Sequence, residues 1–161
     1  MRVVQYKSKL TEAQRVVLEK EYCVNYPQLD RKMTSPEKVA RFATDFLHIH
    51  ERPEEYLYML CMNNKLELTG VFELSHGNVN SSIIGIREMF QKALLANAVN
   101  VIVLHNHPSG DPTPSREDVV VTERMMAAGK LLGIGVLDHI VIGSYARFVS
   151  LKEKGYMKEE N

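Results

Sequence analysis

Residues 99–118, VNVIVLHNHPSGDPTPSRED, carry the clearest structural pattern of the chain together with its clearest chemical one. The β-branched run 99–104 predicts a short buried strand. Side chains alternate along a strand, so His105 and His107 at its carboxyl end point to one face and Asn106 points to the other. The three prolines and one glycine of 108–114 exclude regular structure, and Ser115 then begins a helix over about 116–132. A strand, a tight loop and a helix therefore bring polar side chains together.

The polar side chains of this stretch are the ligand types that zinc prefers. His105 and His107 offer two imidazoles, and Asp118 offers a carboxylate eleven residues after His107. Three protein ligands, instead of four, are typical of catalytic zinc, because one coordination position stays open for water. The stretch therefore predicts a Zn²⁺ site on His105, His107 and Asp118, and a hydrolase.

Ser115 and Asp118 also have the spacing of a capping box, in which the serine caps the helix and the acidic side chain reaches back to it. A carboxylate engaged in this way would be poorly placed for zinc. The two roles are nevertheless compatible, and Ser115 is expected to begin the helix in either case.

A hydrolase that uses zinc-activated water also needs a group that moves protons. The candidates are the carboxylates that precede the histidines: Glu54, Glu55, Glu67 and Glu73. Glu55 begins an expected strand and Glu73 lies near the far end of the next one. The residues alone do not choose between them.

The rest of the chain predicts an α/β domain with a mixed central sheet. Residues 1–34 are expected to be a short helical appendage, with its helix at 11–22, and residues 35–161 to be the main domain. Thr34 or Ser35 caps the first helix of that domain, which runs to about His48. The remaining expected elements are a hairpin of 55–62 and 66–74, a polar loop at 77–82, a helix at 86–98, and strands at 136–142 and 147–151.

Composition narrows the function classes. The formal net charge is zero, which does not indicate nucleic-acid binding. Cys23 and Cys61 are too few for a disulfide framework, and Cys61 is expected to be a buried thiol. There is no secretory signal and no apolar run long enough for a membrane span, so we expect a cytoplasmic protein that makes no membrane contact. The sequence is compatible with a homo-oligomer.

At these residues the chain resembles the JAMM (MPN+) metalloprotease superfamily, and within it the RadC-like JAB domain family. The superfamily pattern is a glutamate, His-x-His-Pro, six residues, Ser, two residues and Asp, and residues 105–118 match it without a gap. Four stretches are typical of RadC-like proteins: HNHPSGDPTPSRED, GNVNSS, LLGIGVLDHIVIG and VSLKEKGY. The resemblance covers about residues 35–156 and implies a single MPN-like (cytidine-deaminase-like) domain.

The resemblance implies a zinc-dependent metallopeptidase that hydrolyses a peptide or isopeptide bond. In the superfamily the glutamate begins the strand after the first helix, which selects Glu55 as the proton carrier over Glu73. Ser115 would hydrogen-bond the developing oxyanion or steady the water. The expected partner is a protein or peptide substrate. The alternatives are a DNA-repair-associated or nucleic-acid-associated accessory factor and a non-catalytic MPN scaffold.

Two features depart from the longer RadC relatives. Those proteins carry an amino-terminal helix-hairpin-helix segment, which we expect this chain to lack, because its first 34 residues resemble those of short RadC-like proteins. The usual Pro-Arg-Glu before the helix near residue 87 is Ile86-Arg87-Glu88 here. His139, in an apolar stretch, is expected to be a core histidine and not a fourth ligand. His48, His50 and His76 are expected at the surface.

Overall fold

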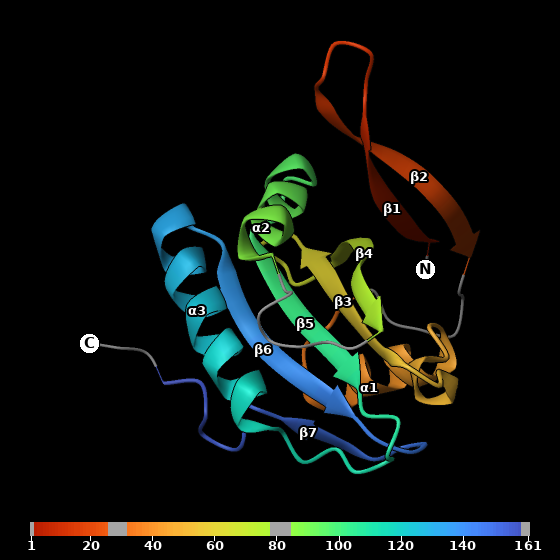
Figure 1. The fold of residues 1–161 in the computed structure, drawn as a ribbon, viewed down its shortest axis with the longest axis vertical. Helices are drawn as coiled ribbons and strands as arrows, with labels where there is room; N and C mark the ends of the chain where they lie inside the picture. Colours follow the sequence, from red (N-terminus) through yellow and green to blue (C-terminus); the bar gives the residue numbers. More distant parts are fainter. Residues whose placement is uncertain (1, 26–31, 78–84, 159–161) are drawn as a thin grey trace.

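Seven strands form one mixed sheet in the computed structural model of this chain, which describes residues 2–25, 32–77 and 85–158 (Figure 1). The order across the sheet is β2-β1-β4-β3-β5-β6-β7. The pairs β1–β4 and β5–β6 are parallel and the others are antiparallel. This confirms the predicted α/β class with a mixed central sheet. The strands are β1 (Arg2–Leu10), β2 (Val16–Asn25), β3 (Glu55–Met62), β4 (Leu68–Gly77), β5 (Asn100–Asn106), β6 (Gly135–Ile142) and β7 (Phe148–Ser150).

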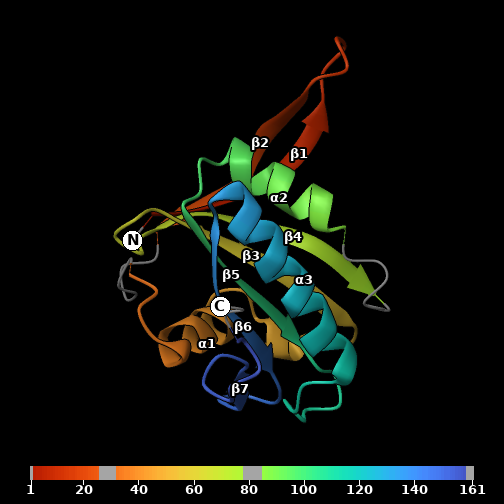
Figure 2. The ribbon, with the colours of Figure 1, turned by 90° about the vertical axis from the view of Figure 1, so that its left-hand side faces the viewer.

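Helices cover both faces of the sheet (Figures 1 and 2). Helix α1 (Pro36–Asp45) packs on one face, and α2 (Ile86–Leu95) and α3 (Arg116–Leu132) pack on the other. A short 3-10 helix, Ile49–Glu51, leads from α1 toward β3.

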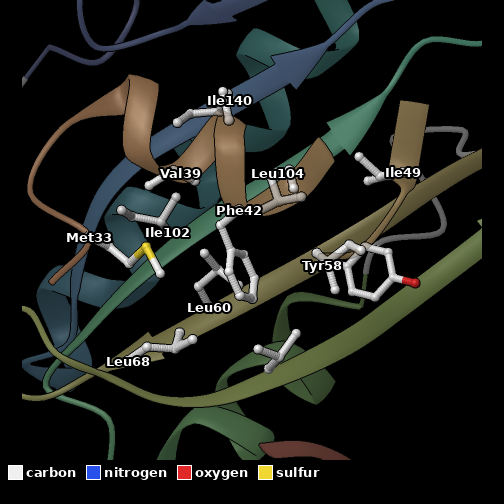
Figure 3. Packing of buried hydrophobic residues seen from close by; sticks show 14 of the residues in the cluster. Met33, Val39, Phe42, Ile49, Tyr58, Leu60, Leu68, Ile102, Leu104 and Ile140 are labelled. Carbon is white, nitrogen blue, oxygen red and sulfur yellow. The ribbon is translucent and has the colours of Figure 1, made fainter. Parts of the chain in front are cut away.

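The apolar run of β3 is continuous because this strand is buried on both faces. Tyr58 and Leu60 enter the cluster under α1, which is drawn in Figure 3 with Phe42 at its centre. Leu57 and Met59 enter the other cluster, under α2 and α3. Leu57 lies opposite His105 of β5, so the second face of β3 is also the face of the predicted metal site.

The helix expected at 11–22 is wrong. Residues 2–25 instead form the β1–β2 hairpin, whose turn contains Gln14 in the left-handed region, at φ 57°. The hairpin is not an isolated appendage, because Gln5 of β1 pairs with Val71 of β4 and Val3 is buried in the core. Pairing of 16–22 with β1, which itself pairs with β4, outweighs the local helix propensity of 11–22.

The helix starts predicted at Ser35 and Ser115 are confirmed. Ser35 caps α1, and its hydroxyl accepts a hydrogen bond from the Lys38 backbone N–H at 3.4 Å. The helix ends at Asp45, earlier than the expected His48, which has left-handed backbone angles. Ser115 caps α3 as expected, and Gly133 ends it at φ 69°.

Two further expectations concern chain segments away from these helix starts. Most of the polar loop expected at 77–82 lies outside the described residues. Within the ranges that are described, no helix has the length and apolar character needed to cross a bilayer.

Candidate metal centre

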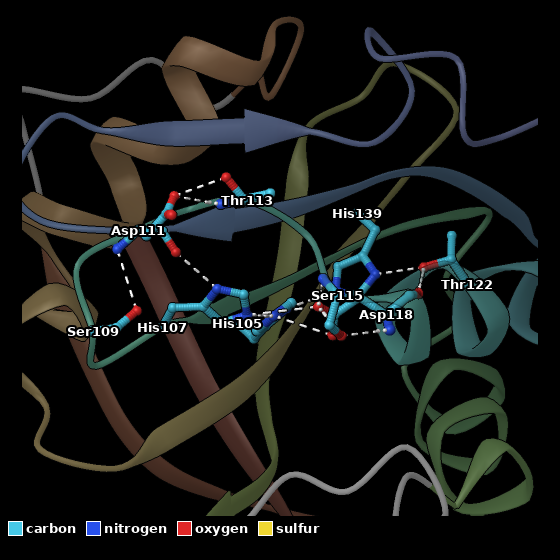
Figure 4. A network of polar contacts seen from close by, with 9 residues as sticks. All are labelled: His105, His107, Ser109, Asp111, Thr113, Ser115, Asp118, Thr122 and His139. Atoms are coloured by element: carbon cyan, nitrogen blue, oxygen red, sulfur yellow. Dashed lines mark hydrogen bonds and ion pairs between the residues drawn. The ribbon is translucent and has the colours of Figure 1, made fainter.

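Strand β5 brings the two predicted histidines to one point. His105 lies within β5, and His107 follows the strand while its backbone N–H still donates to the Ile142 carbonyl of β6 at 2.8 Å. Their Nε2 atoms are 3.0 Å apart (Figure 4). The predicted convergence of these side chains on one face of the strand is therefore confirmed.

Asp118 completes the group from the first turn of α3. Its Oδ1 lies 3.4 Å from His105 Nε2, and its Oδ2 lies 3.6 Å from His107 Nε2. One ligand atom from each of the three residues lies within 4.8 Å of the others, so the group could hold a metal ion.

The spacing fits a tetrahedral zinc site. Zinc bonds of about 2.0–2.2 Å to imidazole nitrogen and carboxylate oxygen imply ligand atoms about 3.3 Å apart. The two Nε2 atoms are 3.0 Å apart, and the Asp118 carboxylate lies 3.4 Å from His105 through Oδ1 and 3.6 Å from His107 through Oδ2, so each pair is close to this value. Within the described part of the chain, the three ligands are two imidazoles and one carboxylate with no thiolate, a set more typical of catalytic than of structural zinc.

Ser115 and Asp118 form the capping box that their spacing allows, and Asp118 still faces the histidines. The backbone N–H and the hydroxyl of Ser115 both donate to Asp118 Oδ2, each at 2.7 Å. The Ser115 hydroxyl oxygen in turn accepts from the Asp118 backbone N–H at 3.1 Å. The capping box therefore fixes the carboxylate with Oδ1 toward His105, so capping and ligation are compatible in this geometry.

The two imidazoles are held by different partners behind the site. His107 Nδ1 donates to the Asp111 carbonyl at 2.9 Å, which leaves its Nε2 facing His105. His105 Nδ1 lies 2.9 Å from Nε2 of His139, and His139 Nδ1 lies 2.6 Å from the Thr122 hydroxyl. His139 is buried and hydrogen-bonded at both nitrogens, which agrees with its expected role as a core histidine.

Asp118 and His107 shift each other's pKa values toward their charged forms. Burial raises the pKa of Asp118, but the neighbouring His105 and His107 imidazoles and the Ser115 hydroxyl outweigh it and hold that pKa well below its usual range. The Asp118 carboxylate raises the pKa of His107, and Glu55 adds a smaller effect in the same direction. Complete burial lowers the pKa of His139 to about 3, so this ring is neutral. The site thus carries a firmly ionised carboxylate, as metal binding requires.

Glu55 is the candidate proton carrier that reaches the site. An open pocket of about 370 Å³ is lined by Glu55, His107, Pro108, Ser109, Ser115, Glu117 and Asp118. Glu55 shares the site face of β3 with Leu57, which pairs with His105.

Glu55 is positioned from the opposite face of β5 by Asn106. The side-chain oxygen Oδ1 of Asn106 accepts from the Tyr56 backbone N–H at 2.7 Å, and its side-chain Nδ2 donates to the backbone carbonyl oxygens of Glu54 and Arg52 at 3.0 and 3.4 Å. These bonds attach the chain on both sides of Glu55 to the strand that carries His105.

The other three glutamates lie elsewhere. The Glu73 carboxylate accepts from the Tyr58 hydroxyl at 3.1 Å and contacts His76 at 3.0 Å. Glu67 accepts from the Asn63 amide, at the opposite end of β3. Glu54 is exposed and does not line the pocket.

The remaining titratable side chains singled out in the sequence lie outside the pocket. His48 and His76 are exposed, as expected, whereas the side chain of His50 is only 12% exposed and packs against Tyr145. Cys61 is buried, and burial raises the pKa of its thiol to about 12.

Sequence reasoning missed three features of the site. Glu117 lines the pocket, Thr122 lies behind it, and Asn106 positions Glu55. The strand alternation already pointed Asn106 away from the histidines, but its partners around residue 54 are some fifty positions away in sequence. Only the β3–β5 pairing reveals them.

Comparison with known proteins shows similarity over the part of the chain that carries the candidate site. The family model for the RadC-like JAB domain matches residues 33–156. A UPF0758 protein of Methanosarcina barkeri is 45% identical over 128 residues, which are 80% of this chain and 55% of that protein. A UPF0758 protein of Caldanaerobacter subterraneus is 45% identical over 124 residues, 77% of this chain and 52% of that one.

A third relative, a UPF0758 protein of Bacillus cereus, is 44% identical over 123 residues, 76% of this chain and 53% of its own length. The chain thus spans about half the length of the curated relatives it matches. The family model covers the strand, loop and helix that carry His105, His107 and Asp118, and it extends over most of the sheet. The chain belongs to the RadC-like JAB domain family.

Proposed function

We propose that this domain is a zinc-dependent metallopeptidase that hydrolyses a peptide or isopeptide bond. The observation that carries the proposal is the convergence of His105 Nε2, His107 Nε2 and an Asp118 carboxylate oxygen, with Glu55 lining the same open pocket. His105, His107 and Asp118 would hold the ion. Zinc bound there would lower the pKa of a coordinated water to about 7 and polarise a substrate carbonyl.

Glu55 moves the proton in this reaction. Its carboxylate accepts a proton from the attacking water as the water oxygen bonds to the carbonyl carbon. The carbon–nitrogen bond then breaks, and Glu55 delivers the same proton to the nitrogen of the leaving amine. The products are a carboxylic acid and an amine, so atoms and charge balance.

Ser115 has a double role in the proposal. Its hydroxyl can turn its hydrogen from Asp118 toward the developing oxyanion, and losing one such donor typically costs about 10²–10³-fold in rate. While the hydroxyl hydrogen points to the oxyanion, the Ser115 backbone N–H, at 2.7 Å, continues to donate to Asp118 Oδ2. The carboxylate therefore stays oriented during the reaction.

The test combines metal analysis with a search for cleaved proteins and peptides, by wild type and by Glu55→Gln. Glu55→Gln should bind zinc as wild type does and lose about 10²–10⁴-fold in turnover, the usual contribution of a general acid–base. Glu117→Gln is the matched control, because it neutralises another carboxylate that lines the pocket. Asp118→Asn should lose the metal as well as the activity.

Two results would contradict the proposal. One is a wild-type protein that binds no zinc at saturating concentration. The other is substrate cleavage by Glu55→Gln at the wild-type rate.

A further inference from the structure

A chain of buried hydrogen bonds connects His105 to the backbone of Asp118 through β6 and α3. His105 Nδ1 is 2.9 Å from His139 Nε2, and His139 Nδ1 is 2.6 Å from the Thr122 hydroxyl. The Thr122 hydroxyl then donates to the Asp118 carbonyl oxygen at 2.5 Å. His105, His139 and Thr122 are each at most 2% exposed, so water does not compete for these bonds (Figure 4).

The direction of every bond in this chain follows from its last member. A backbone carbonyl only accepts, so the single hydrogen of the Thr122 hydroxyl is used there. The Thr122 oxygen must therefore accept from His139 Nδ1–H. A neutral imidazole carries one hydrogen, so His139 Nε2 is left with a lone pair and must accept from His105 Nδ1–H.

The consequence reaches the metal site. If the hydrogen of a neutral His105 is on Nδ1, its Nε2 has a free lone pair, and Nε2 is the atom that faces His107 and Asp118. We propose that His139 and Thr122 are positioning residues that hold His105 in the tautomer able to bind a metal through Nε2. The inference rests on the metal site of the proposed function and assigns a role to two residues outside it.

This arrangement also connects ligands that come from different elements. The chain starts at the imidazole of one ligand, on β5, and ends at the carbonyl of another, Asp118 on α3. Histidine ligands of metal sites generally donate their second nitrogen to a fixed acceptor, and losing that acceptor typically costs about 10–100-fold in metal affinity. Here the acceptor is a second histidine, whose own orientation depends on Thr122.

Thr122→Val is the sharpest test, because it keeps the shape of the side chain and removes the acceptor. His139 is then free to carry its hydrogen on Nε2 and donate to His105 Nδ1, which would push the His105 hydrogen onto the metal-facing nitrogen. We expect Zn²⁺ affinity, measured by competition with a chromogenic chelator, to fall about 10–100-fold. Thr122→Ser keeps the hydroxyl and should restore affinity to near the wild-type value.

His139→Leu provides a second variant, which removes the acceptor for His105 altogether and should weaken Zn²⁺ binding over the same range. Ile140→Val is its control, because Ile140 is the next residue of β6 and is buried on the opposite face. A role in packing alone would lower stability in all these variants without separating Thr122→Val from Thr122→Ser in affinity.

The tautomer itself can be observed without metal, by long-range ¹H–¹⁵N correlation spectra of the histidine rings. We expect His105 in the metal-free wild type to carry its hydrogen on Nδ1, and Thr122→Val to shift it toward Nε2. Wild-type zinc affinity in Thr122→Val, or an Nε2–H tautomer in the wild type, would overturn the inference and leave the proposed function standing. If wild type binds no zinc, the proposed function fails while these spectra still decide the tautomer.

Discussion

The side chain of Asn106 accepts a hydrogen bond from the backbone N–H of Tyr56, at 2.7 Å, across the β3–β5 pair. Asn106 is between the two histidines in sequence but faces the opposite side of the sheet. The carboxyl end of β5 thus carries the two candidate histidine ligands on one face and, on the other, the side chain that binds the backbone beside Glu55.

Asn106→Ala should therefore separate catalysis from metal binding. Losing the bonds to residues 52–56 leaves backbone groups unsatisfied and should lower the free energy of unfolding by about 1–3 kcal/mol. A displacement of Glu55 by about 1 Å would reduce turnover by about 10²-fold, whereas zinc affinity should stay near wild type. Amide hydrogen exchange at Tyr56, chelator competition and peptide cleavage measure the three effects.

Asn63→Ala is the matched control for this prediction. The Asn63 side chain makes similar bonds to backbone N–H groups, of Lys65 and Glu67, but at the opposite end of β3. It should lower stability and leave turnover unchanged. Equal turnover in the two variants would rule out a positioning role for Asn106.

The stability of the metal-free protein should depend on pH through His139. Burial lowers its folded-state pKa to about 3, whereas an unfolded histidine titrates near 6.5. The unfolded state thus binds a proton that the folded state refuses, and the stabilisation present above about pH 6.5 is lost progressively as the pH falls toward about 3. Urea unfolding between pH 6.5 and 4.5 should show this decline, and His139→Gln should flatten it.

The other shifted groups of the site act in different pH ranges. The raised pKa of His107 stabilises the folded state at pH values below about 6.5, and this contribution disappears as the pH rises through the raised pKa. The lowered pKa of Asp118 stabilises the folded state above about pH 3.9, and this contribution is lost only as the pH falls further. The exposed His48 gives the control: His48→Gln should keep the wild-type slope, and a wild-type slope in His139→Gln would refute the assignment.

Gly143→Ala should disturb the metal centre through the loop after His107. A Cβ at Gly143 would collide with the carbonyl oxygen of Gly110 and lie 2.8 Å from Pro112 Cδ. We expect a loss of about 1–3 kcal/mol in stability together with weaker Zn²⁺ binding, because the loop must shift.

Gly129→Ala is the comparison for Gly143→Ala, since a Cβ there would meet the Ile134 carbonyl oxygen at 2.5 Å, near the other end of α3. It should lower stability by a similar amount, seen in thermal unfolding, without changing zinc affinity. If both variants bind zinc as wild type does, the contact between Gly143 and Gly110 has no influence on the site.

Val3→Ala should show that the amino-terminal hairpin is part of the folded domain. Val3 is 1% exposed and belongs to the cluster under α1, so truncating it should cost about 1–3 kcal/mol. Val17, on the neighbouring strand, is 38% exposed, and Val17→Ala should change stability by less than about 0.5 kcal/mol. Denaturant unfolding compares the two, and a loss for Val3→Ala as small as the one expected for Val17→Ala would mean that the hairpin contributes little.

The grouping of the three candidate metal ligands was predictable from sequence because its geometry is local. Alternation along β5 and the Ser115 cap of α3 place His105, His107 and Asp118 within one short segment, and neither depends on distant contacts. The same holds for Ser35 at the start of α1.

The β1–β2 hairpin was not predictable in this way. Residues 11–22 contain helix-forming glutamate, leucine and lysine, yet 16–22 form a strand because they pair with 5–10 of β1, which in turn pairs with β4. The placement of Glu55 and the partners of His139 have the same origin. Local pattern predicts an element, whereas the register between strands decides which side chains meet.

The separation in sequence between Glu55 and the metal ligands has a consequence for the order of assembly. Residues 105–118 can approach one another by closing a short loop, whereas Glu55 reaches them only after β3 pairs with β5 over a much longer contour, with a higher loop-closure entropy. Under the proposed function, the three candidate ligands would therefore meet before Glu55 joins them. The proposed hydrolytic activity would then depend on the β3–β5 pairing, a later step of folding than the closure of the loop between His107 and Asp118.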